Sequence, residues 1–262
     1  MSQYQEKAIV AKVEQFANKN FRLTLDCPQI SGCATPGQFV MIKAGKGNDP
    51  LLRRPFSIHQ TTGEGRLQVF FKVVGRGTEL LSQVRVHQEI SVLGPLGRGF
   101  RINKLAPAVI IGGGLGIAPL LFLAKEYCRV KKNCCEDLIL LGAREKMEIE
   151  PILGDFQQIG IKIFTATDDG TLGHHGFVTQ IMQSAVLPAG CTVYACGPEP
   201  MLAGVSKIAR SLKLPCQVSV ESVMACGMGA CLGCTRVAKD GTYTHVCLNG
   251  PVYDAEELQW NI

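Results

Sequence analysis

Aromatic side chains are scarce in this sequence: they make up 6% of 262 residues and include one Trp. A protein that stacks nucleic-acid bases relies on such rings, so the composition argues against that class of binding protein. The excess of basic residues is also small, because 27 basic and 22 acidic residues leave a formal net charge of +5. A mild excess gives little support for a polyanionic partner. We therefore expect no nucleic-acid partner.

The chain also lacks the marks of export and of membrane insertion. Its first residues, Met1–Lys7, are polar and contain no apolar signal core. Residues 105–124 carry no charge, but two prolines and four glycines interrupt them, and a lipid-facing helix tolerates such a cluster poorly. We interpret this stretch as strand, glycine turn and helix. The sequence thus predicts a soluble cytoplasmic protein without a membrane span, in which disulfide bonds are not expected.

The length excludes one large class of enzyme. A typical (β/α)₈ barrel takes about 250 residues, so 262 residues cannot hold such a barrel together with a nucleotide-binding domain. The hydrophobic fraction of 46% and charged fraction of 19% supply a core and give no sign of disorder. The length instead suggests roughly two domains.

Two kinds of pattern divide the chain. In the first hundred residues, short apolar runs alternate with turn signals, as where Phe21, Leu23 and Leu25 alternate with polar residues, and this predicts a small antiparallel barrel. From residue 105 on, strand-like runs at 109–111, 138–141, 161–165 and 192–195 alternate with helical segments such as 119–130 and 201–212. That alternation predicts a parallel α/β sheet covered on both faces. The pattern ends after Pro215, so we expect domains at 1–102, 103–215 and 216–262.

Twelve cysteines are many for this length, and four of them have a distinctive spacing. Cys226, Cys231 and Cys234 form C-x4-C-x2-C, and Cys247 follows after twelve residues. This matches the plant-type [2Fe–2S] pattern, whereas a structural zinc site usually pairs two C-x2-C knuckles. Small residues between the cysteines let the backbone aim N–H groups at the sulfurs. We predict a [2Fe–2S] cluster, and expect most of the other eight cysteines to be small buried apolar residues.

Two glycine-rich loops are candidates for binding phosphate. Residues 109–119 place Gly112–Gly114 and Gly116 between an apolar strand and a helix, where a pyrophosphate can approach backbone N–H groups. The alternative is a turn that only permits tight packing of strand on helix. Residues 196–201 open another helix at the same edge of the expected sheet, and Cys196 at that strand end is placed to touch a nicotinamide.

The expected barrel holds two further candidate segments. In Arg53–Ile58, an Arg at a strand end can clamp a pyrophosphate and a Ser can reach a flavin edge, but the residues alone favour a charged strand end beside a core Phe. Gly75–Glu79 follows a strand. There Thr78 is expected to cap a helix, and the capped N-terminus is suited to a second phosphate.

Together these segments resemble the ferredoxin–NAD(P) reductase superfamily. Arg54–Ser57 is similar to its R-x-[YF]-S flavin motif and Gly75–Thr78 to its flavin-phosphate helix. Residues 112–119 and 196–201 are similar to its nicotinamide-nucleotide motifs. The cysteine module narrows the resemblance to the family of B-type dihydroorotate dehydrogenase electron-transfer subunits, as do Pro36–Val40, Gly94–Gly97 and Thr167–Gly170.

The resemblance implies a six-stranded antiparallel flavin-binding barrel, a central NAD-binding α/β domain and a C-terminal cluster module. In that family the subunit binds FAD and a [2Fe–2S] cluster and pairs with an FMN-containing catalytic subunit as a heterotetramer of two plus two. Electrons pass from dihydroorotate through FMN, the cluster and FAD to NAD in pyrimidine biosynthesis. The implied FAD positions are Arg54, Pro55, Phe56, Ser57, Phe71, Lys72, Val73, Gly77 and Thr78; the implied NAD positions are Gly113, Gly114, Gly116, Cys196, Gly197 and Pro198; the implied cluster ligands are Cys226, Cys231, Cys234 and Cys247.

No acid or base residue is expected, because the cofactors carry the reaction. The residues themselves do not decide between NAD and NADP: Arg144 favours the 2′-phosphate of NADP and Glu145 opposes it. The resemblance implies NAD.

Two alternatives to an electron-transfer subunit of dihydroorotate oxidation remain. One is the reductase subunit of a ferredoxin:NAD(P) oxidoreductase or hydrogenase-type complex. The other is a zinc-stabilised interaction module without redox activity.

Overall fold

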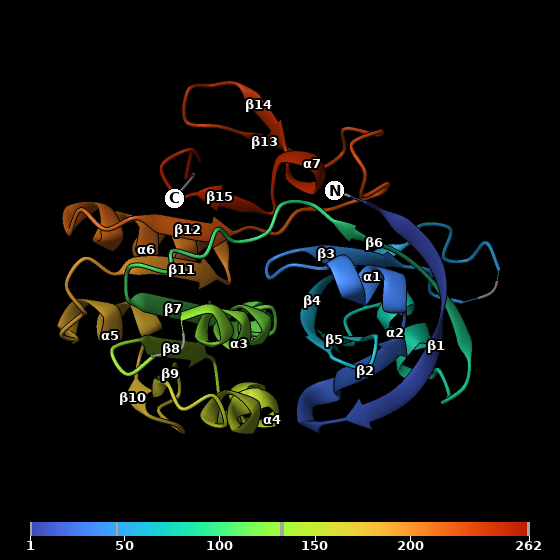
Figure 1. Cartoon of the computed structure of the whole chain (residues 1–262), viewed down its shortest axis with the longest axis horizontal. Coiled ribbons are helices and arrows are strands. Elements are labelled where there is room, and N and C mark those ends of the chain that lie inside the picture. Colours follow the sequence, from blue (N-terminus) through green and yellow to red (C-terminus); the bar gives the residue numbers. More distant parts are fainter. Residues whose placement is uncertain (1, 46, 132–133, 261–262) are drawn as a thin grey trace. The chain divides into compact units, whose positions relative to one another are not determined.

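A computed structural model of the chain describes residues 2–45, 47–131 and 134–260 (Figure 1). These residues group into two compact units. The barrel unit comprises Met1–Gly99, Glu221–Arg236 and Thr244–Pro251, and the sheet unit comprises Phe100–Val220, Val237–Tyr243 and Val252–Ile262. The last forty or so residues are thus shared between the units. No helix among the described residues is long and apolar enough to cross a membrane.

The N-terminal part of the barrel unit is a closed antiparallel barrel, as predicted. Its strand order is β1-β2-β5-β4-β3-β6. In β2, Phe21, Leu23 and Leu25 are buried, which confirms the alternation read from the sequence. The turn before it uses left-handed residues, with φ of 56° at Asn18 and 58° at Lys19. The strands are β1 (Tyr4–Gln15), β2 (Asn20–Asp26), β3 (Phe39–Ile42), β4 (Arg54–Thr62), β5 (Arg66–Lys72) and β6 (Glu89–Leu96).

Short helices complete the barrel unit. They are η1 (Ala17–Lys19), α1 (Pro28–Cys33), α2 (Arg76–Ser82) and α7 (Val246–Asn249). A small two-stranded sheet pairs β13 (Thr235–Val237) with β14 (Tyr243–His245), and the residues of these strands are divided between the two units.

The sheet unit contains the predicted parallel sheet. Its order is β10-β9-β8-β7-β11-β12-β15, and all neighbours are parallel except β12 and β15. The six residues of β7 are all buried, as a central strand with both faces covered requires. The strands are β7 (Ala108–Gly113), β8 (Leu138–Ala143), β9 (Lys162–Thr167), β10 (His174–His175), β11 (Thr192–Cys196), β12 (Cys216–Ser219) and β15 (Val252–Asp254).

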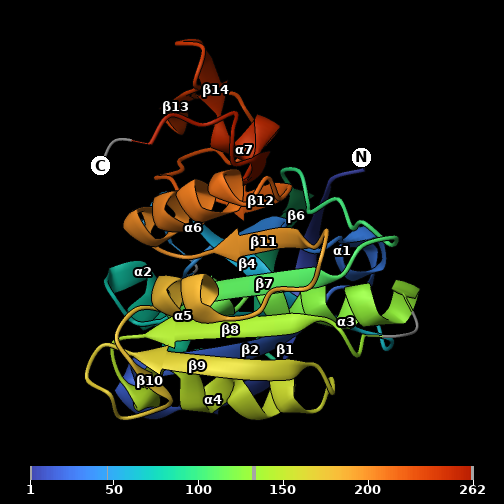
Figure 2. The ribbon, with the colours of Figure 1, turned by 90° about the vertical axis from the view of Figure 1, so that its left-hand side faces the viewer.

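Helices lie on both faces of this sheet. Figures 1 and 2 show α3 and α4 on one face and α5 and α6 on the other. The chain runs from β7 to β8 and β9 on one side of β7, then returns to form β11 and β12 on its other side. The helices are η2 (Gly114–Ile117), α3 (Leu120–Lys131), α4 (Lys146–Gln157), α5 (Val178–Ser184) and α6 (Glu199–Ser211).

The expected end of the sheet pattern at Pro215 is wrong. Cys216–Ser219 forms the parallel strand β12, and Val252–Asp254 adds an antiparallel strand beyond it. The strand β12 is short and contains the buried polar side chain of Gln217. That side chain is satisfied by Arg101, whose N–H donates to Gln217 Oε1 at 2.9 Å and whose carbonyl accepts from Nε2 at 2.9 Å. Such remote hydrogen bonds leave no pattern in the sequence.

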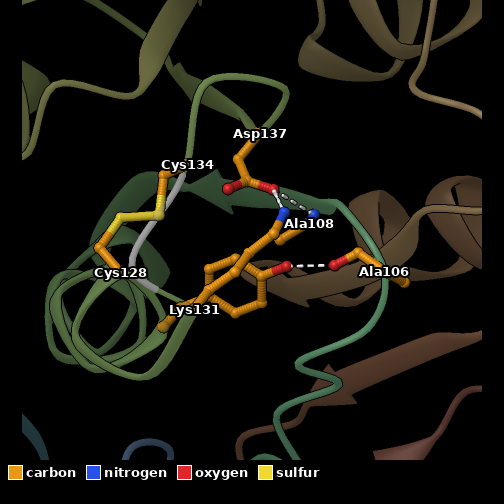
Figure 3. The surroundings of a disulfide bond; sticks show 7 residues. Ala106, Ala108, Cys128, Lys131, Cys134 and Asp137 are labelled. Atoms are coloured by element: carbon orange, nitrogen blue, oxygen red, sulfur yellow. Dashed lines mark hydrogen bonds and ion pairs between the residues drawn. A yellow bond between two sulfur atoms is a disulfide. The ribbon is translucent and has the colours of Figure 1, made fainter.

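The expectation of no disulfides is also wrong. Cys128, near the end of α3, is bonded to Cys134 in the turn before β8 (Figure 3). Their Cα atoms are 5.9 Å apart, a usual separation for a disulfide. An ion pair joins the same segments, because Lys131 Nζ lies 3.0 Å from Asp137 Oδ1. The Asp137 oxygen also accepts a 2.7 Å hydrogen bond from the N–H of Ala108, so the helix end is held to the starts of β7 and β8.

The eight cysteines outside the four-cysteine motif differ in their exposure to solvent. Most of them were expected to be buried, but fewer are, because Cys33 lies at the end of a short helix and Cys135 in a turn at the surface. Cys27, Cys191 and Cys196 are buried, Cys216 is half-buried, and Cys33 and Cys135 are exposed.

Candidate functional site

The four motif cysteines lie together in the barrel unit and form two pairs. In one pair, the backbone N–H of Cys231 donates to Cys226 Sγ at 3.4 Å. In the other, the sulfurs of Cys234 and Cys247 are 3.2 Å apart and buried. Cys247 comes from α7, and the other three come from the loop before β13. The predicted ligands are therefore gathered from two segments of the chain.

Backbone N–H groups point at all four sulfurs. Cys226 Sγ accepts from Met228 and Cys231 at 3.4 Å each, Cys231 Sγ from Gly233 at 3.4 Å, Cys234 Sγ from Cys247 at 3.4 Å, and Cys247 Sγ from Gly229 at 3.1 Å. The turns that aim these groups need Gly227 and Gly229, with φ of 74° and 83°, in the left-handed region that favours glycine. Amide donors of this kind stabilise negative charge on the sulfurs of an iron–sulfur cluster.

The pKa values of Cys226 and Cys247 are shifted in opposite directions. Burial raises the pKa of the Cys226 thiol, but hydrogen bonds from the Met228 and Cys231 N–H groups outweigh that effect and bring the pKa to about 6. Burial, together with the hydrogen bond to Cys234, raises the pKa of Cys247 to about 12. Cys226 is therefore a thiolate at neutral pH, the form that binds metal, whereas at Cys247 a metal must displace the proton.

The pairing distinguishes two metals. Zinc draws four ligands around one point in a tetrahedron. Here the sulfurs are arranged in pairs, with those of Cys234 and Cys247 3.2 Å apart. Two separate pairs of thiols suit two metal ions instead. The donor set and its amide cradle thus fit a [2Fe–2S] cluster better than a single zinc ion.

The predicted flavin positions meet at one end of the barrel. The strands β4 and β5 are antiparallel neighbours, with Ile58 opposite Val69, so the start of β4 lies beside the end of β5. The rings of Phe56 and Phe71 are accordingly 5.4 Å apart. Phe56 is only 8% exposed, so core contacts occupy most of its surface, while Ser57 is half-exposed.

A guanidinium lies over the start of α2 at this end of the barrel. A Cβ built on Gly77 would come within 2.7 Å of Arg54 Nε, so only glycine leaves room for the arginine there. Arg54 Nη1 also donates to the carbonyl of Leu52 at 2.8 Å. A fixed arginine beside backbone N–H groups at a helix start is a suitable arrangement for phosphate.

The expectation that Thr78 is the N-cap is wrong. The N-cap of α2 is Gly75, and Thr78 lies three residues further on. Its hydroxyl oxygen accepts from the N–H groups of Val74 at 2.9 Å and Gly75 at 3.1 Å. Thr78 therefore reaches back to the cap from the first turn, the role that the third residue has in a capping box.

We expect Gly77→Ala to weaken FAD binding by about 10-fold or more, because a hydrogen bond to a charged group contributes about 1.5–3 kcal/mol. The added methyl group would displace Arg54, although alanine suits the helix better than glycine. Titration of the apoprotein with FAD, followed by flavin fluorescence, measures the change. Gly32→Ala in α1 of the same unit is the matched control, since no atom lies within 4 Å of a Cβ there. Equal affinities for the two variants would contradict the assignment.

The two predicted nucleotide loops touch each other at the carboxyl ends of β7 and β11. A Cβ on Gly116 would lie 2.5 Å from Gly197 Cα, and one on Gly113 would lie 2.4 Å from Met201 Sδ. A Cβ on Gly197 would lie 2.6 Å from Met201 Cε. Gly116 is therefore required for packing, the alternative left open by the sequence, whereas the atoms nearest to Gly113 and Gly197 belong to the end of the flexible Met201 side chain. Gly114 differs, because its φ is 53° and a Cβ there would meet no atom within 4 Å.

The place of these loops in the sheet still favours a ligand. The chain turns to opposite sides of β7 at the boundary between β7 and β11, and open α/β sheets bind ligands in the crevice at such a point. Cys196 ends β11 there and is 3% exposed. Sequence reasoning included Met201 in the second loop but missed that its sulfur fills the space beside Gly113, and it missed the contacts of Met41 described below.

Two family models match the chain. Residues 9–100 match the model described as an oxidoreductase FAD-binding domain, and residues 221–259 match that described as the iron–sulfur cluster binding domain of dihydroorotate dehydrogenase B. With the barrel, the sheet and the thiol cradle, these matches define the class: the protein is an oxidoreductase with a flavin-binding domain and an iron–sulfur module.

Similar proteins narrow this class. The electron transfer subunit of dihydroorotate dehydrogenase B (NAD(+)) from Desulforamulus reducens is 38% identical over 97% of each chain. The subunit of the same name from Fusobacterium nucleatum is 34% identical over 97% of this chain and 98% of its own. The chain belongs to this family of electron transfer subunits. A solved chain of the NADH-dependent reduced ferredoxin–NADP oxidoreductase, from work on flavin-based electron bifurcation, has a TM-score of 0.85 at 29% identity over 97% of this chain and 90% of its own.

Proposed function

We propose that this chain carries electrons between a catalytic dihydroorotate dehydrogenase subunit and NAD⁺, using FAD and a [2Fe–2S] cluster. Relatives that match over nearly the full length and carry that name support the role. The observation that carries the proposal is the cradle of four thiols, in two pairs with amide donors, within the same unit as the flavin barrel. When bound, a flavin exchanges two electrons with a nicotinamide and one at a time with a cluster.

The residues of the chain bind and orient the cofactors. Arg54 and the start of α2 would hold the FAD phosphates, and the other FAD positions would line the barrel end, namely Pro55, Phe56, Ser57, Phe71, Lys72, Val73, Gly77 and Thr78. The loops of Gly113, Gly114, Gly116, Cys196, Gly197 and Pro198 would hold the NAD. Cys226, Cys231, Cys234 and Cys247 would be the cluster ligands. The amide donors would keep negative charge on their sulfurs and so set the potential.

The cluster module also carries exposed apolar side chains. Those of Val223, Met228, Leu232 and Leu248 are 88%, 45%, 54% and 52% exposed. Leu248 lies against Gly229, since a Cβ there would meet its Cδ2 at 3.4 Å. Exposed apolar groups around a redox centre suit a partner that must approach it closely. We infer that the FMN-containing catalytic subunit docks here, in a cytoplasmic heterotetramer of two plus two.

Leu248→Asp is expected to weaken this complex by about 10-fold or more, because a charge would replace a central apolar contact. The dissociation constant for the purified catalytic subunit measures the effect, with iron content as a check on the cluster. Val86→Asp is the matched control, an apolar side chain that is also 46% exposed in the barrel unit. Equal loss of affinity in the two variants would refute docking at the cluster module.

The overall proposal is tested on the purified chain. We expect a flavin and iron–sulfur absorption spectrum, about two irons and two acid-labile sulfides per chain, and oxidation of NADH by an artificial acceptor. Oxidation of dihydroorotate should require the catalytic subunit. Turnover of dihydroorotate by the chain alone would overturn the proposal, and a colourless protein with zinc would support the zinc-stabilised interaction module.

A second function is favoured by one observation. The solved ferredoxin–NADP oxidoreductase chain has the same fold over nearly its whole length at 29% identity, so a ferredoxin-linked complex would use the same cofactors. Recovery of a large ferredoxin-linked or hydrogenase subunit with the tagged protein from its native cell would favour that function. Recovery of the dihydroorotate dehydrogenase subunit would favour the first.

A further inference from the structure

The short strand β3 of the barrel is buried along both faces. Its residues Phe39–Ile42 are 0–4% exposed, although the outer face of a small barrel usually meets solvent. Phe39 and Met41 alternate along the strand and therefore share a face. A Cβ on Gly97 would meet Phe39 Cε1 at 2.9 Å and Pro251 Cδ at 2.6 Å. The segment that carries the cysteines thus covers this face of β3 within the barrel unit.

Met41 touches the cysteine loop directly. A Cβ built on Gly227 would lie 2.6 Å from Met41 Cγ and 3.0 Å from its Sδ, so the thioether packs on the Cα atom of Gly227. Leu96 of β6 borders the same contact at 3.4 Å. Gly227 has a left-handed φ of 74° and follows Cys226, the thiol that binds two N–H groups of this loop. A flexible thioether is well suited to fill such an irregular gap.

The same face carries two of the predicted flavin positions. In the pairing of β3 with β4, Phe39 is opposite Ser57 and Met41 is opposite Pro55. Directly opposite residues in an antiparallel pair lie on one face, with Cβ atoms about 4.5–5.5 Å apart. Met41 therefore lies between the loop of the cysteines and the strand of the flavin motif.

An arginine holds β3 in this position. Arg53, the residue before β4, donates from Nη1 to the carbonyl of Met41 at 3.4 Å. It also donates to the carbonyl of Ser91 at 2.9 Å and to its hydroxyl at 2.9 Å. Ser91 belongs to β6, the neighbour of β3 on the other side. One half-buried guanidinium thus connects the residue in contact with the cysteine loop to both flanking strands.

We propose that Met41 is a positioning residue for electron transfer within the barrel unit. Its side chain packs between the cysteine loop and β4, the strand of the flavin motif, and would exclude water from the side of the cluster that faces the barrel. This inference rests on the proposed function, because it requires that both FAD and the cluster bind. Solvent exposure is one of the factors that set the reduction potential of an iron–sulfur cluster. The contact between Met41 and the cysteine loop would therefore affect the potential as well as the rate of electron transfer.

The test compares Met41→Ala with Leu25→Ala, a residue on β2 that is also 0% exposed. Each variant is reconstituted with FAD, iron and sulfide. The measurements are the EPR spectrum of the reduced cluster, its midpoint potential and the rate at which NADH reduces it in stopped flow. We expect Met41→Ala to change the spectrum, raise the potential and slow transfer about 10-fold, the lower end of the range for residues that support metal ligands. Leu25→Ala should lower thermal stability without these changes.

Two further variants keep the test decisive if Met41→Ala does not fold. Met41→Leu keeps the volume and apolar character, so it should restore the wild-type potential and rate. Met41→Gln puts an amide beside the loop and should shift the potential. A wild-type spectrum, potential and rate in Met41→Gln or in folded Met41→Ala would overturn the inference. If the wild-type protein itself holds no flavin or no cluster, the proposed function fails instead.

Discussion

Cys247→Ser is expected to abolish electron transfer to the catalytic subunit while leaving NADH oxidation by an artificial acceptor intact. The Cys247 sulfur is buried 3.2 Å from that of Cys234 and accepts the N–H of Gly229, so its loss breaks one of the two thiol pairs. A serine hydroxyl is a harder ligand that iron in such clusters seldom uses. Residues that only support a metal ligand already contribute 10–100-fold to affinity, and removal of a ligand should exceed that range.

The measurements separate the cluster from the flavin. Iron and acid-labile sulfide should fall close to zero per chain, FAD content should stay at the wild-type value, and reduction of the catalytic subunit by NADH should fall by more than about 100-fold. Cys33→Ser is the matched control, because this exposed thiol of the barrel unit lies outside the four-cysteine motif and donates to the carbonyls of Gln29 and Ile30. If Cys247→Ser still passes electrons to the catalytic subunit at the wild-type rate, the relay through the cluster is wrong.

The cluster motif was predictable because its chemistry is local. Three thiols lie within nine residues and the fourth closes the set shortly after, so spacing alone suggested two irons. The barrel and the parallel sheet were predictable for a similar reason, since the alternation at Phe21, Leu23 and Leu25 and the apolar run of β7 reflect burial directly. In each case, residues close together in the sequence meet one physical requirement, either metal ligation or burial, so their spacing reveals it.

Contacts between distant segments were not predictable. Nothing near Gln217 indicates its hydrogen bonds with Arg101, 116 residues away. The disulfide between Cys128 and Cys134 spans only six residues, and it was missed because the expected compartment argued against disulfides. The contact of Met41 with Gly227 joins the start of the chain to its cysteine module. The glycines of the nucleotide loops show a related limit, because a glycine needed for packing and one needed for phosphate look alike in sequence.

Gly116→Ala is expected to lower kcat/KM for NADH by about 100-fold, an effect known for misplacement by about 1 Å near a reacting group. Its added Cβ would lie 2.5 Å from the Cα and N atoms of Gly197 and 2.6 Å from the carbonyl carbon of Cys196. These are backbone atoms that no rotamer change can move, so the loops after β7 and β11 must separate. Overpacking of this kind also costs about 1–3 kcal/mol of stability.

The expected loss should be confined to the nucleotide step. FAD, iron and sulfide contents should equal those of the wild type, and dithionite should still reduce both cofactors, because their predicted ligands lie in the barrel unit. Gly154→Ala, in the middle of α4 with no atom within 4 Å of its Cβ position, is the control and should be neutral or slightly stabilising. Gly114 faces open space but has a left-handed φ of 53°, so Gly114→Ala strains the loop backbone and should raise KM for NADH more than it lowers kcat. A Gly116→Ala variant with a wild-type kcat/KM would mean that the nucleotide does not bind where these two loops meet.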